Sequence, residues 1–322
     1  MQLSPATTDN IELAANLILN GGIVAFPTET VYGLGASASN EDAINRIYSI
    51  KGRPKNNPLI VHVHSVDQVL SLVKYDNDKI KIIMEKFWPG PLTLVMNYKS
   101  SSFINSIARA NLTTIAIRIP SNPIALKLLK KVNIPIIAPS ANISEHLSPT
   151  KAHHVNQDLG DKLNHNTDMI LDGGDCNIGI ESTVLDVTKN QAKILRPGGL
   201  SVENIRNHLK NVSSDHIENE NKPISPGQFK KHYSPKASLR LNAKEPLDYE
   251  AWLGFGPDEN NLNCKFQMNL SKTGNLDEAA KNLFSMLRYL DKKNIDTIAV
   301  KAIPNDGIGL AINDRLIRGA SK

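Results

Sequence analysis

Short apolar segments of strand type alternate irregularly with segments of helix type over the first two thirds of the chain. Apolar residues at every third or fourth position indicate helices, whereas short apolar or alternating runs indicate strands. Helices are expected near residues 9–20, 40–50, 123–132 and 201–209, and another after Ser65. Strands are expected at 23–26, 59–64, 92–97, 113–119, 134–138, 169–171, 183–187 and 193–195. This irregular order predicts an α/β or α+β domain with a mixed sheet.

Two of the expected helices begin with capping signals. Asp9 and Glu12, three residues apart, resemble a capping box, and Ser65 with Gln68 resembles another. The pair Gly21–Gly22 is expected to end the first helix, because glycine readily adopts the backbone conformation that terminates helices.

A polar, proline-containing stretch interrupts the pattern at about residues 212–235, as in a linker or a functional lid. Beyond it, strands are expected at 250–255 and 297–300, and helices at 276–290 and 309–317. The 322 residues also exceed the roughly 250–300 that one hydrophobic core usually supports. We therefore expect a first domain at 1–211, a linker or lid at 212–238 and a small α/β domain at 239–322.

The composition excludes several classes of protein. No run approaches the ~18 apolar residues of a membrane-spanning helix, and the first residues lack a secretory signal, so a cytoplasmic protein without a membrane partner is expected. Cys176 and Cys264 form no metal-ligand pair and exclude a disulfide framework, although one disulfide is left open. The net charge of +5 supports a polyanionic ligand such as a nucleotide or RNA only weakly.

The chain carries no glycine-rich phosphate loop of the Walker or Rossmann type. A nucleotide would therefore have to be held by side-chain cations and short turns. Lys51 and Arg53 lie in a loop after a helix, where together they could grip a triphosphate. A solvated loop is the simpler alternative, because two cations at this spacing are common.

Polar residues also follow or end two apolar strands. Ser140 and Asn142 come after the strand at 134–138, where α/β folds bind ligands, although a self-satisfied turn is the simpler explanation. Arg118 ends an otherwise apolar strand and needs an anion, either a carboxylate of the protein or one of a substrate. Each is a candidate contact that needs support from the rest of the chain.

A protein-held metal ion is not expected. His62 and His64 lie two positions apart on one strand, but no nearby carboxylate or cysteine completes a ligand set. The other candidates have simpler roles: a loop surface for His153 and His154, and capping or turn positions for Asp172, Asp175 and Glu181.

The order of several motifs is more informative than any one of them. They are Pro27-Thr28-Glu29-Thr30-Val31-Tyr32-Gly33-Leu34, Lys51-Gly52-Arg53-Pro54, Ala138-Pro139-Ser140-Ala141-Asn142, Glu181-Ser182-Thr183-Val184 and Arg196-Pro197-Gly198. In this order they closely resemble the YrdC-like domain, which is a twisted mixed sheet with flanking helices. Ser225-Pro226-Gly227, His232-Tyr233-Ser234-Pro235 and residues 309–315 resemble the additional part of its long form. The whole chain is thus similar to the two-domain threonylcarbamoyl-AMP synthase family. This resemblance implies that residues 1–211 form the catalytic domain and that residues 239–322 form a small Rossmann-like α/β domain.

The resemblance implies a nucleotidyltransferase that converts L-threonine, bicarbonate and ATP into threonylcarbamoyl-AMP and diphosphate. The product would pass to a downstream transferase complex that modifies adenosine in tRNA, with direct tRNA contact left open. The implied contacts to ATP or the adenylate are Lys51, Arg53, Asn57, Thr114, Ser140, Asn142, Ser148, Arg196 and Tyr233, of which Lys51 and Arg53 would be catalytic. The implied threonine and carbamate pocket consists of Thr30, His62, Arg118, Ala138 and Ser182.

The implied chemistry requires charge neutralisation rather than a protein nucleophile, because the carbamate and ATP are both anionic. Lys51, Arg53 and Arg196 would surround the phosphates, and Arg118 would pair with the threonine carboxylate. Mg²⁺ is expected as a cofactor held mainly by ATP and water, since no carboxylate cage is evident.

The linker would act as a lid, because the carbamate and the mixed anhydride both react with water. Gly227 and Tyr233 lie within this linker. Gln228 stands where the family usually has methionine, which leaves the local packing of the lid open.

Two alternatives are kept. Hydrogenase-maturation carbamoyltransferases contain a YrdC-like module, but they are larger and carry zinc-finger-like segments that two isolated cysteines do not provide. A non-enzymatic RNA-binding module would suit the positive charge, although only 5% of the residues are aromatic and can stack on bases. ATP turnover that depends on threonine would distinguish the enzyme from the binding module.

Overall fold

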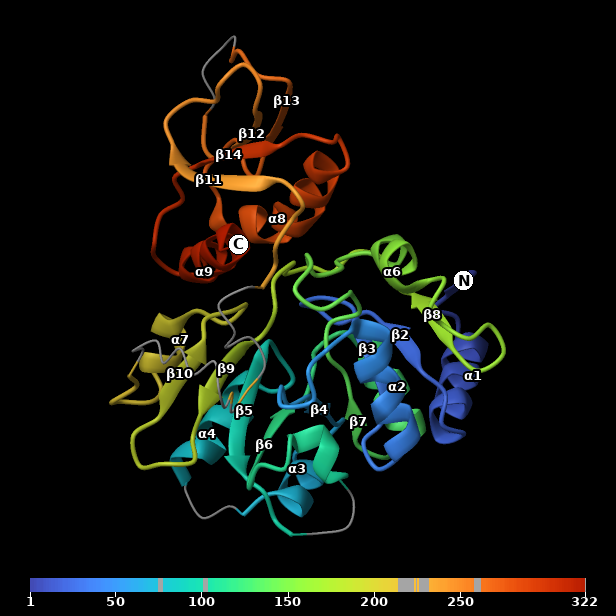
Figure 1. Ribbon diagram of the computed structural model, residues 1–322. Coiled ribbons are helices and arrows are strands. Elements are labelled where there is room, and N and C mark those ends of the chain that lie inside the picture. Colours follow the sequence, from blue (N-terminus) through green and yellow to red (C-terminus); the bar gives the residue numbers. More distant parts are fainter. Residues whose placement is uncertain are drawn as a thin grey trace.

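The computed structural model describes residues 1–74, 78–100, 104–213, 223, 225, 232–257 and 262–321 (Figure 1). The strands of the first region are β1 (Leu3–Pro5), β2 (Val24–Phe26), β3 (Gly33–Ser37), β4 (Ile60–His62), β5 (Leu92–Asn97), β6 (Thr114–Arg118), β7 (Ile136–Ile137), β8 (Met169–Asp172), β9 (Thr183–Asp186) and β10 (Lys193–Arg196). Its helices are α1 (Thr8–Leu19), α2 (Glu41–Lys51), α3 (Val66–Leu72), α4 (Asp78–Phe87), the 3-10 helix η1 (Ser106–Arg109), α5 (Pro123–Val132), α6 (Ala152–Leu159) and α7 (Val202–Arg206).

The strands of this region form one mixed sheet in the order β1-β8-β2-β3-β7-β4-β6-β5-β9-β10. Strand β4 runs parallel to β6 and antiparallel to β7, which confirms the predicted mixed sheet. Helices α1 and α5 pack on one face, whereas α2, α3, α4, α6 and α7 contribute to the core on the other face. This arrangement places consecutive strand residues in different layers, so Val61 enters the core while Ile60 and His62 face the opposite side.

Capping residues explain where several helices begin. The Asn122 side chain accepts hydrogen bonds from the backbone N–H groups of Ile124 and Ala125, so α5 has the predicted bounds. Ser65 caps α3 as predicted, at 3.3 Å from the backbone nitrogen of Gln68.

The predicted cap at Asp9 is wrong, because Thr7 is the N-cap of α1 and accepts a hydrogen bond from the backbone N–H of Asn10. Asp9 instead lies in the first turn, where its negative charge favours the helix N-terminus.

The loop surface expected around His153 and His154 is also wrong. Both residues belong to α6, and His154 is buried with its Nδ1 accepting a hydrogen bond from the backbone N–H of Thr150. The N-cap residue Lys151 makes no capping hydrogen bond with its side chain, which explains why the start of this helix carries no sequence signal.

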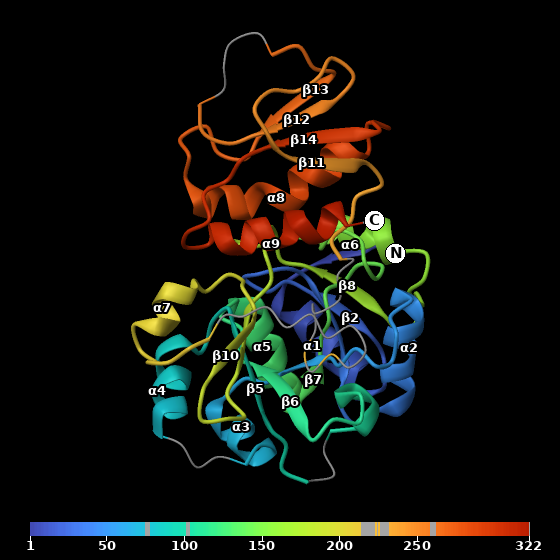
Figure 2. The same ribbon diagram turned by 60° about the vertical axis from the view of Figure 1, so that its left-hand side comes forward.

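Beyond the linker, the second region has the strands β11 (Ser238–Ala243), β12 (Ala251–Gly254), β13 (Phe266–Asn269) and β14 (Thr297–Lys301) and the helices α8 (Leu276–Asp291) and α9 (Gly309–Ala320). Its strands form a parallel sheet in the order β11-β14-β12-β13, which confirms a small α/β domain. Both α8 and α9 lie between this sheet and the first domain (Figures 1 and 2). The second domain therefore meets the first through its helices.

Three further expectations concern the linker, the cysteines and membranes. Most of the linker, including Gly227 and Gln228, lies outside the described residues. Cys176 and Cys264 are free thiols, so the disulfide left open by the sequence does not form. Within the described part of the chain, every helix is too short or too polar to span a bilayer.

Candidate active site

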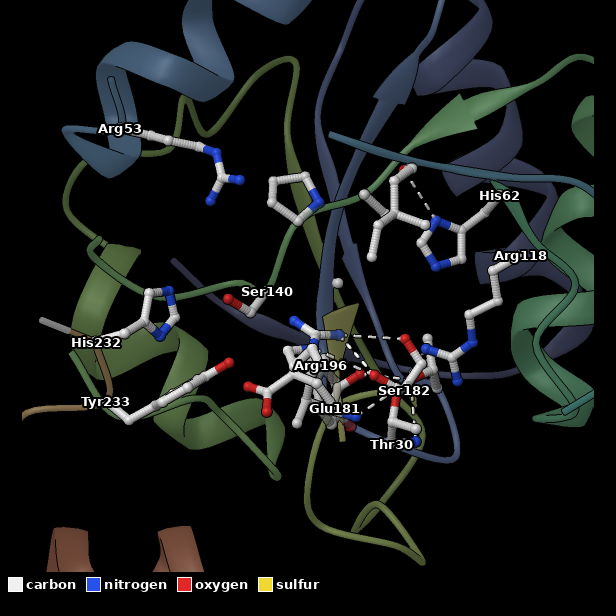
Figure 3. Close-up of a pocket in the computed structure, with 17 residues that line it drawn as sticks. Thr30, Arg53, His62, Arg118, Ser140, Glu181, Ser182, Arg196, His232 and Tyr233 are labelled. Carbon is white, nitrogen blue, oxygen red and sulfur yellow. Dashed lines mark hydrogen bonds between the residues drawn. The ribbon is translucent and has the colours of Figure 1, made fainter. Parts of the chain in front are cut away.

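A pocket lies where β2, β4 and β6 end and where the loops before β9 and after β7 approach them (Figure 3). It contains all of the residues predicted to bind threonine and carbamate, namely Thr30, His62, Arg118, Ala138 and Ser182. From the predicted ATP contacts it contains Arg53, Ser140, Arg196 and Tyr233. Segments up to about two hundred residues apart in the sequence thus meet in one cavity.

Other predicted ATP contacts do not line this pocket: Lys51, Asn57, Thr114, Asn142 and Ser148. Four of these five residues contact residues that line the pocket. Lys51 and Asn142 contact Ser140, Asn57 contacts Arg53, and Ser148 contacts Glu181. Thr114 is different, because it begins β6 whereas Arg118 ends it, and it pairs with Asn97 at the far end of the strand.

Arg118 and His62 lie side by side because β4 and β6 are parallel neighbours in which these two residues are in register. Arg118 is buried, with one terminal nitrogen 2.6 Å from Glu29 Oε1 and the other donating to Thr30 Oγ1 at 2.8 Å. The anion that the buried cation required is therefore a protein carboxylate, Glu29. Sequence reasoning missed this role, although Glu29 lies within the motif next to Thr30.

His62 is neutral in this site. Its Nδ1 is 3.2 Å from the carbonyl oxygen of Ile60, and a carbonyl can only accept, so Nδ1 carries the hydrogen. Burial, together with the nearby charge of Arg118, lowers the pKa of His62 to about 3. The remaining nitrogen, Nε2, is thus a hydrogen-bond acceptor beside a fixed positive charge.

Lys51 and Arg53 are both buried although Gly52, Pro54, Lys55 and Asn56 of the same loop are exposed, so the solvated-loop alternative is wrong for these two cations. Gly52 is the C-cap of helix α2, and its left-handed backbone (φ +61°) suits glycine. The Arg53 guanidinium donates to the side-chain oxygen of Asn57 at 2.6 Å. Lys51 points elsewhere, and its ammonium group donates to the carbonyl oxygens of Ser140 and Asn142, each at 2.6 Å.

Among the described residues that line the pocket, Glu181 alone carries a carboxylate. Its Oε2 accepts a hydrogen bond from Arg315 Nε at 2.8 Å, and its Oε1 accepts one from the Ser148 hydroxyl. Burial would raise the pKa of Glu181, but the charges of Arg315 and Arg196 outweigh this effect and hold it at about 2. Glu181 is therefore a fixed anion rather than the turn residue that was expected.

Arg196 and Ser182 form the centre of the pocket floor. The Arg196 guanidinium donates to the backbone carbonyl of Ser182 at 2.8 Å and lies 3.3 Å from its hydroxyl oxygen. In Figure 3, Arg118 and His62 lie on one side of Arg196, whereas the other side holds Arg53, His232 and Tyr233. The pocket thus has two ends, each with its own guanidinium group.

The residues that close the second end come from the end of the linker. Both His232 and Tyr233 line the pocket wall, where Tyr233 is buried and His232 is partly buried. The Tyr233 hydroxyl has no hydrogen-bond partner among the described residues. Burial lowers the pKa of His232 to about 3, so this ring is also neutral. The sequence motif contained His232, but sequence reasoning assigned a role to Tyr233 alone.

The comparisons with known proteins cover both domains. A family model described as "Telomere recombination" (the Sua5, YciO and YrdC group) matches residues 16–198, and one described as "Threonylcarbamoyl-AMP synthase, C-terminal domain" matches residues 200–321.

Individual relatives extend over nearly the whole chain. It is 39% identical to threonylcarbamoyl-AMP synthase of Bacillus subtilis (strain 168), covering 96% of this chain and 92% of that protein. It is 38% identical to the Pyrococcus abyssi protein of the same name, covering 95% and 92%. The crystal structure of P. abyssi Sua5 complexed with L-threonine superimposes with a TM-score of 0.89 at 34% identity and covers 99% of this chain and 98% of that one.

Proposed function

The chain belongs to the threonylcarbamoyl-AMP synthase family, and we propose that its pocket joins L-threonine, bicarbonate and ATP into threonylcarbamoyl-AMP with release of diphosphate and water. It is a nucleotidyltransferase-type enzyme, and this reaction is the first step of the threonylcarbamoyl modification of adenosine in tRNA. One observation supports the site most strongly: Arg53, Arg118 and Arg196 line one pocket with a neutral histidine. The P. abyssi relative solved with L-threonine supports the choice of amino acid.

At the first end of the pocket, Arg118 binds the threonine carboxylate. Its contacts with Glu29, Thr30 and Gly90 use one N–H group on each nitrogen, so each terminal nitrogen retains one N–H. Two such groups can donate to a carboxylate. Glu29 and Thr30 hold the guanidinium in place before the substrate arrives, which reduces the entropy lost on binding.

His62 orients the nitrogen that becomes the carbamate. Its Nε2 lone pair accepts a hydrogen bond from the threonine amino group or from the carbamate N–H. A pKa of about 3 makes His62 a weak base. It therefore orients the threonine nitrogen through a hydrogen bond and does not take up the proton of that nitrogen. The carbamate oxygen then attacks the α-phosphorus of ATP and diphosphate leaves.

At the second end, Arg53 and Arg196 neutralise the phosphates. The attacking carbamate and ATP repel each other, so fixed cations on both sides of the reaction centre lower the barrier. Tyr233 adds its hydroxyl, which has no partner in the described part of the chain, and the lid that ends at this residue excludes water from the mixed anhydride. Lys51 supports the site indirectly, because its two hydrogen bonds hold the loop that carries Ser140.

Mg²⁺ enters this proposal as a companion of ATP. Glu181 is the carboxylate that lines the pocket within the described chain, and both of its oxygens already accept hydrogen bonds from Ser148 and Arg315. No group of three or more metal-ligating side chains occurs among the described residues. These residues fit a cation that the phosphates and water hold, and the ion would add positive charge where diphosphate leaves.

The remaining parts of the proposal concern organisation and partners. We place the catalytic domain at 1–211, the linker at 212–238 and the second domain at 239–322. The two family models support a division into two parts, although they divide the chain near residue 199, before α7 and the linker. The product would pass in the cytoplasm to a downstream transferase complex acting on tRNA. The net charge of +5 gives weak support to direct tRNA contact.

Labelled bicarbonate tests the proposed reaction. The protein is incubated with ATP, Mg²⁺, L-threonine and labelled bicarbonate, and the label should appear in an adenylate together with released diphosphate. Both signals should disappear without threonine and fall with serine, which lacks the methyl group. Diphosphate release that does not depend on threonine would contradict the proposal, and salt-sensitive RNA binding without turnover would favour the RNA-binding alternative.

A further inference from the structure

The second domain reaches the wall of the pocket through one arginine of α9. Arg315 is buried, with its Nε 2.8 Å from Glu181 Oε2 and one terminal nitrogen 2.9 Å from the carbonyl oxygen of Pro197. Its guanidinium carbon also lies 5.0 Å from the centre of the Tyr233 ring. Two residues that line the pocket, Glu181 and Tyr233, thus contact one side chain that does not line it.

The loop before Glu181 is itself packed into the second domain. Ile180 is fully buried in a hydrophobic cluster formed mainly by residues of α8, α9 and the second sheet. At Gly179 (φ +83°) a Cβ atom would lie 2.5 Å from the Cα of Lys281 in α8, so only glycine permits this approach. Val31 and Leu147, which flank other parts of the site, belong to the same cluster. The second domain therefore supports several segments of the site at once.

We propose that Arg315 is a positioning residue, which holds the Glu181 carboxylate away from Arg196 and toward Ser148 so that Arg196 stays available for the phosphates of ATP. This inference rests on the proposed function, because it assumes that Arg196 serves the nucleotide. It gives the second domain a direct part in the site, in addition to carrying the end of the lid.

The electrostatic balance of the site explains why the position of Glu181 matters. Glu181 and Arg196 already interact, because the charge of Arg196 lowers the pKa of Glu181 and the charge of Glu181 acts to raise the pKa of Arg196. Without Arg315, the buried carboxylate would lose its strongest partner and Arg196 would be the nearest replacement. A carboxylate paired with Arg196 would cancel the positive charge that the phosphates require. The threonine end would be unaffected, because Arg118 has its own partner, Glu29.

The key comparison uses Arg315→Gln, Glu181→Gln and the double variant. We expect Arg315→Gln to raise the KM for ATP at least tenfold while the KM for threonine changes less than twofold. In the double variant no carboxylate is left to capture Arg196, so the KM for ATP should return at least partly toward the wild-type value. If Arg315 only stabilised the loop, the double variant should have a KM for ATP at least as high as that of Arg315→Gln. Removing both partners would then give the loop no compensation for the lost ion pair.

Two more variants control for folding and domain contact. Asp158→Asn weakens another ion pair between the domains, that with Arg288, and should leave both KM values within twofold of wild type. Arg315→Lys keeps the charge and should give an intermediate KM for ATP, which keeps the proposal testable if Arg315→Gln does not fold. Hydrogen exchange of residues 178–184 in the free protein should increase in Arg315→Gln and provides a readout independent of activity.

The outcomes separate this inference from the proposed function. If the wild-type protein forms no threonylcarbamoyl-AMP, the proposed function fails. If the wild type is active and Arg315→Gln leaves the KM for ATP unchanged, or if the double variant shows no recovery, the positioning role of Arg315 is refuted while the proposed function stands.

Discussion

The ammonium group of Lys51 lies 2.6 Å from the carbonyl oxygen of Ser140, a residue 89 positions further along the chain. The same group donates to the carbonyl oxygen of Asn142 at the same distance. Burial, and secondarily the charge of Arg53, lowers the pKa of Lys51 well below its ordinary value. Lys51 thus fixes the loop of Ser140, which lines the pocket, without lining the pocket itself.

Replacing Lys51 by methionine should impair both stability and turnover. The variant leaves one buried and one partly buried carbonyl group without this donor, which costs about 1–3 kcal/mol. Adenylate formation should fall at least tenfold because the loop of Ser140 loses its support. Thermal unfolding and the labelled-bicarbonate assay measure the two effects. Lys55→Met is the matched control, since Lys55 is exposed in the same loop and should change neither quantity appreciably. Full activity in Lys51→Met would contradict the role.

Replacing Arg118 by lysine should act on threonine and spare ATP. Lysine keeps the charge but cannot bond Glu29, Thr30 and a substrate carboxylate from fixed positions. We expect the KM for threonine to rise at least tenfold and the KM for ATP to change less than threefold, measured by diphosphate release. Equal changes in the two KM values would show that Arg118 does not define the threonine end.

The hydroxyl of Tyr233 can be tested with a pair of variants. Tyr233→Phe removes an oxygen that has no partner among the described residues, so it should leave the melting temperature almost unchanged. If the hydroxyl contacts the adenylate, turnover should nevertheless fall several-fold. Tyr233→Ala should lower the adenylate yield further, because the lid no longer closes, while threonine binding persists. Wild-type turnover in both variants would exclude the lid.

Acid should destabilise the protein through its buried neutral histidines. The pKa of His154 is about 3 in the folded protein, lowered by burial and then by the charge of Arg288, whereas an unfolded histidine has a pKa near 6.5. Between these values the unfolded state binds more protons, so the free energy of unfolding decreases as the pH falls. One such histidine contributes about 1.4 kcal/mol per pH unit in this window.

Urea unfolding at pH 7 and pH 5 measures this effect. His154→Gln should lose about 2 kcal/mol less stability over this interval than the wild type, because one titrating group is gone. His165→Gln, at an exposed position, should follow the wild type. An unchanged pH dependence in His154→Gln would mean that this histidine is not held neutral in the folded state.

Local signals explain which parts of the fold could be predicted from the sequence. The Asn122 cap and Pro123 define α5, and the period of apolar residues defines α8. Helix α4 and strand β11 were not predicted. Strand β11 does alternate polar residues with the apolar Leu239, Leu241 and Ala243, so its local signal was present but was missed at the end of the polar linker.

The sequence motifs predicted some residues of the site but not the ion pairs that hold them in place. The resemblance identified Arg118 and Arg196, but the two acidic residues that hold or balance charge, Glu29 and Glu181, were not assigned these roles. Their partners, Arg118 and Arg315, lie 89 and 134 residues away. Such pairs depend on tertiary contacts, which no local pattern encodes. Lys51 illustrates the same limit, because its motif predicts a phosphate contact and the fold turns it toward two carbonyl groups.

A crystal structure with L-threonine and a non-hydrolysable ATP analogue would test the central claim most directly. We expect the threonine carboxylate on Arg118 and the phosphates between Arg53 and Arg196, with the α-phosphorus facing the threonine nitrogen. Phosphates bound outside this pocket, or threonine bound away from Arg118, would contradict the account.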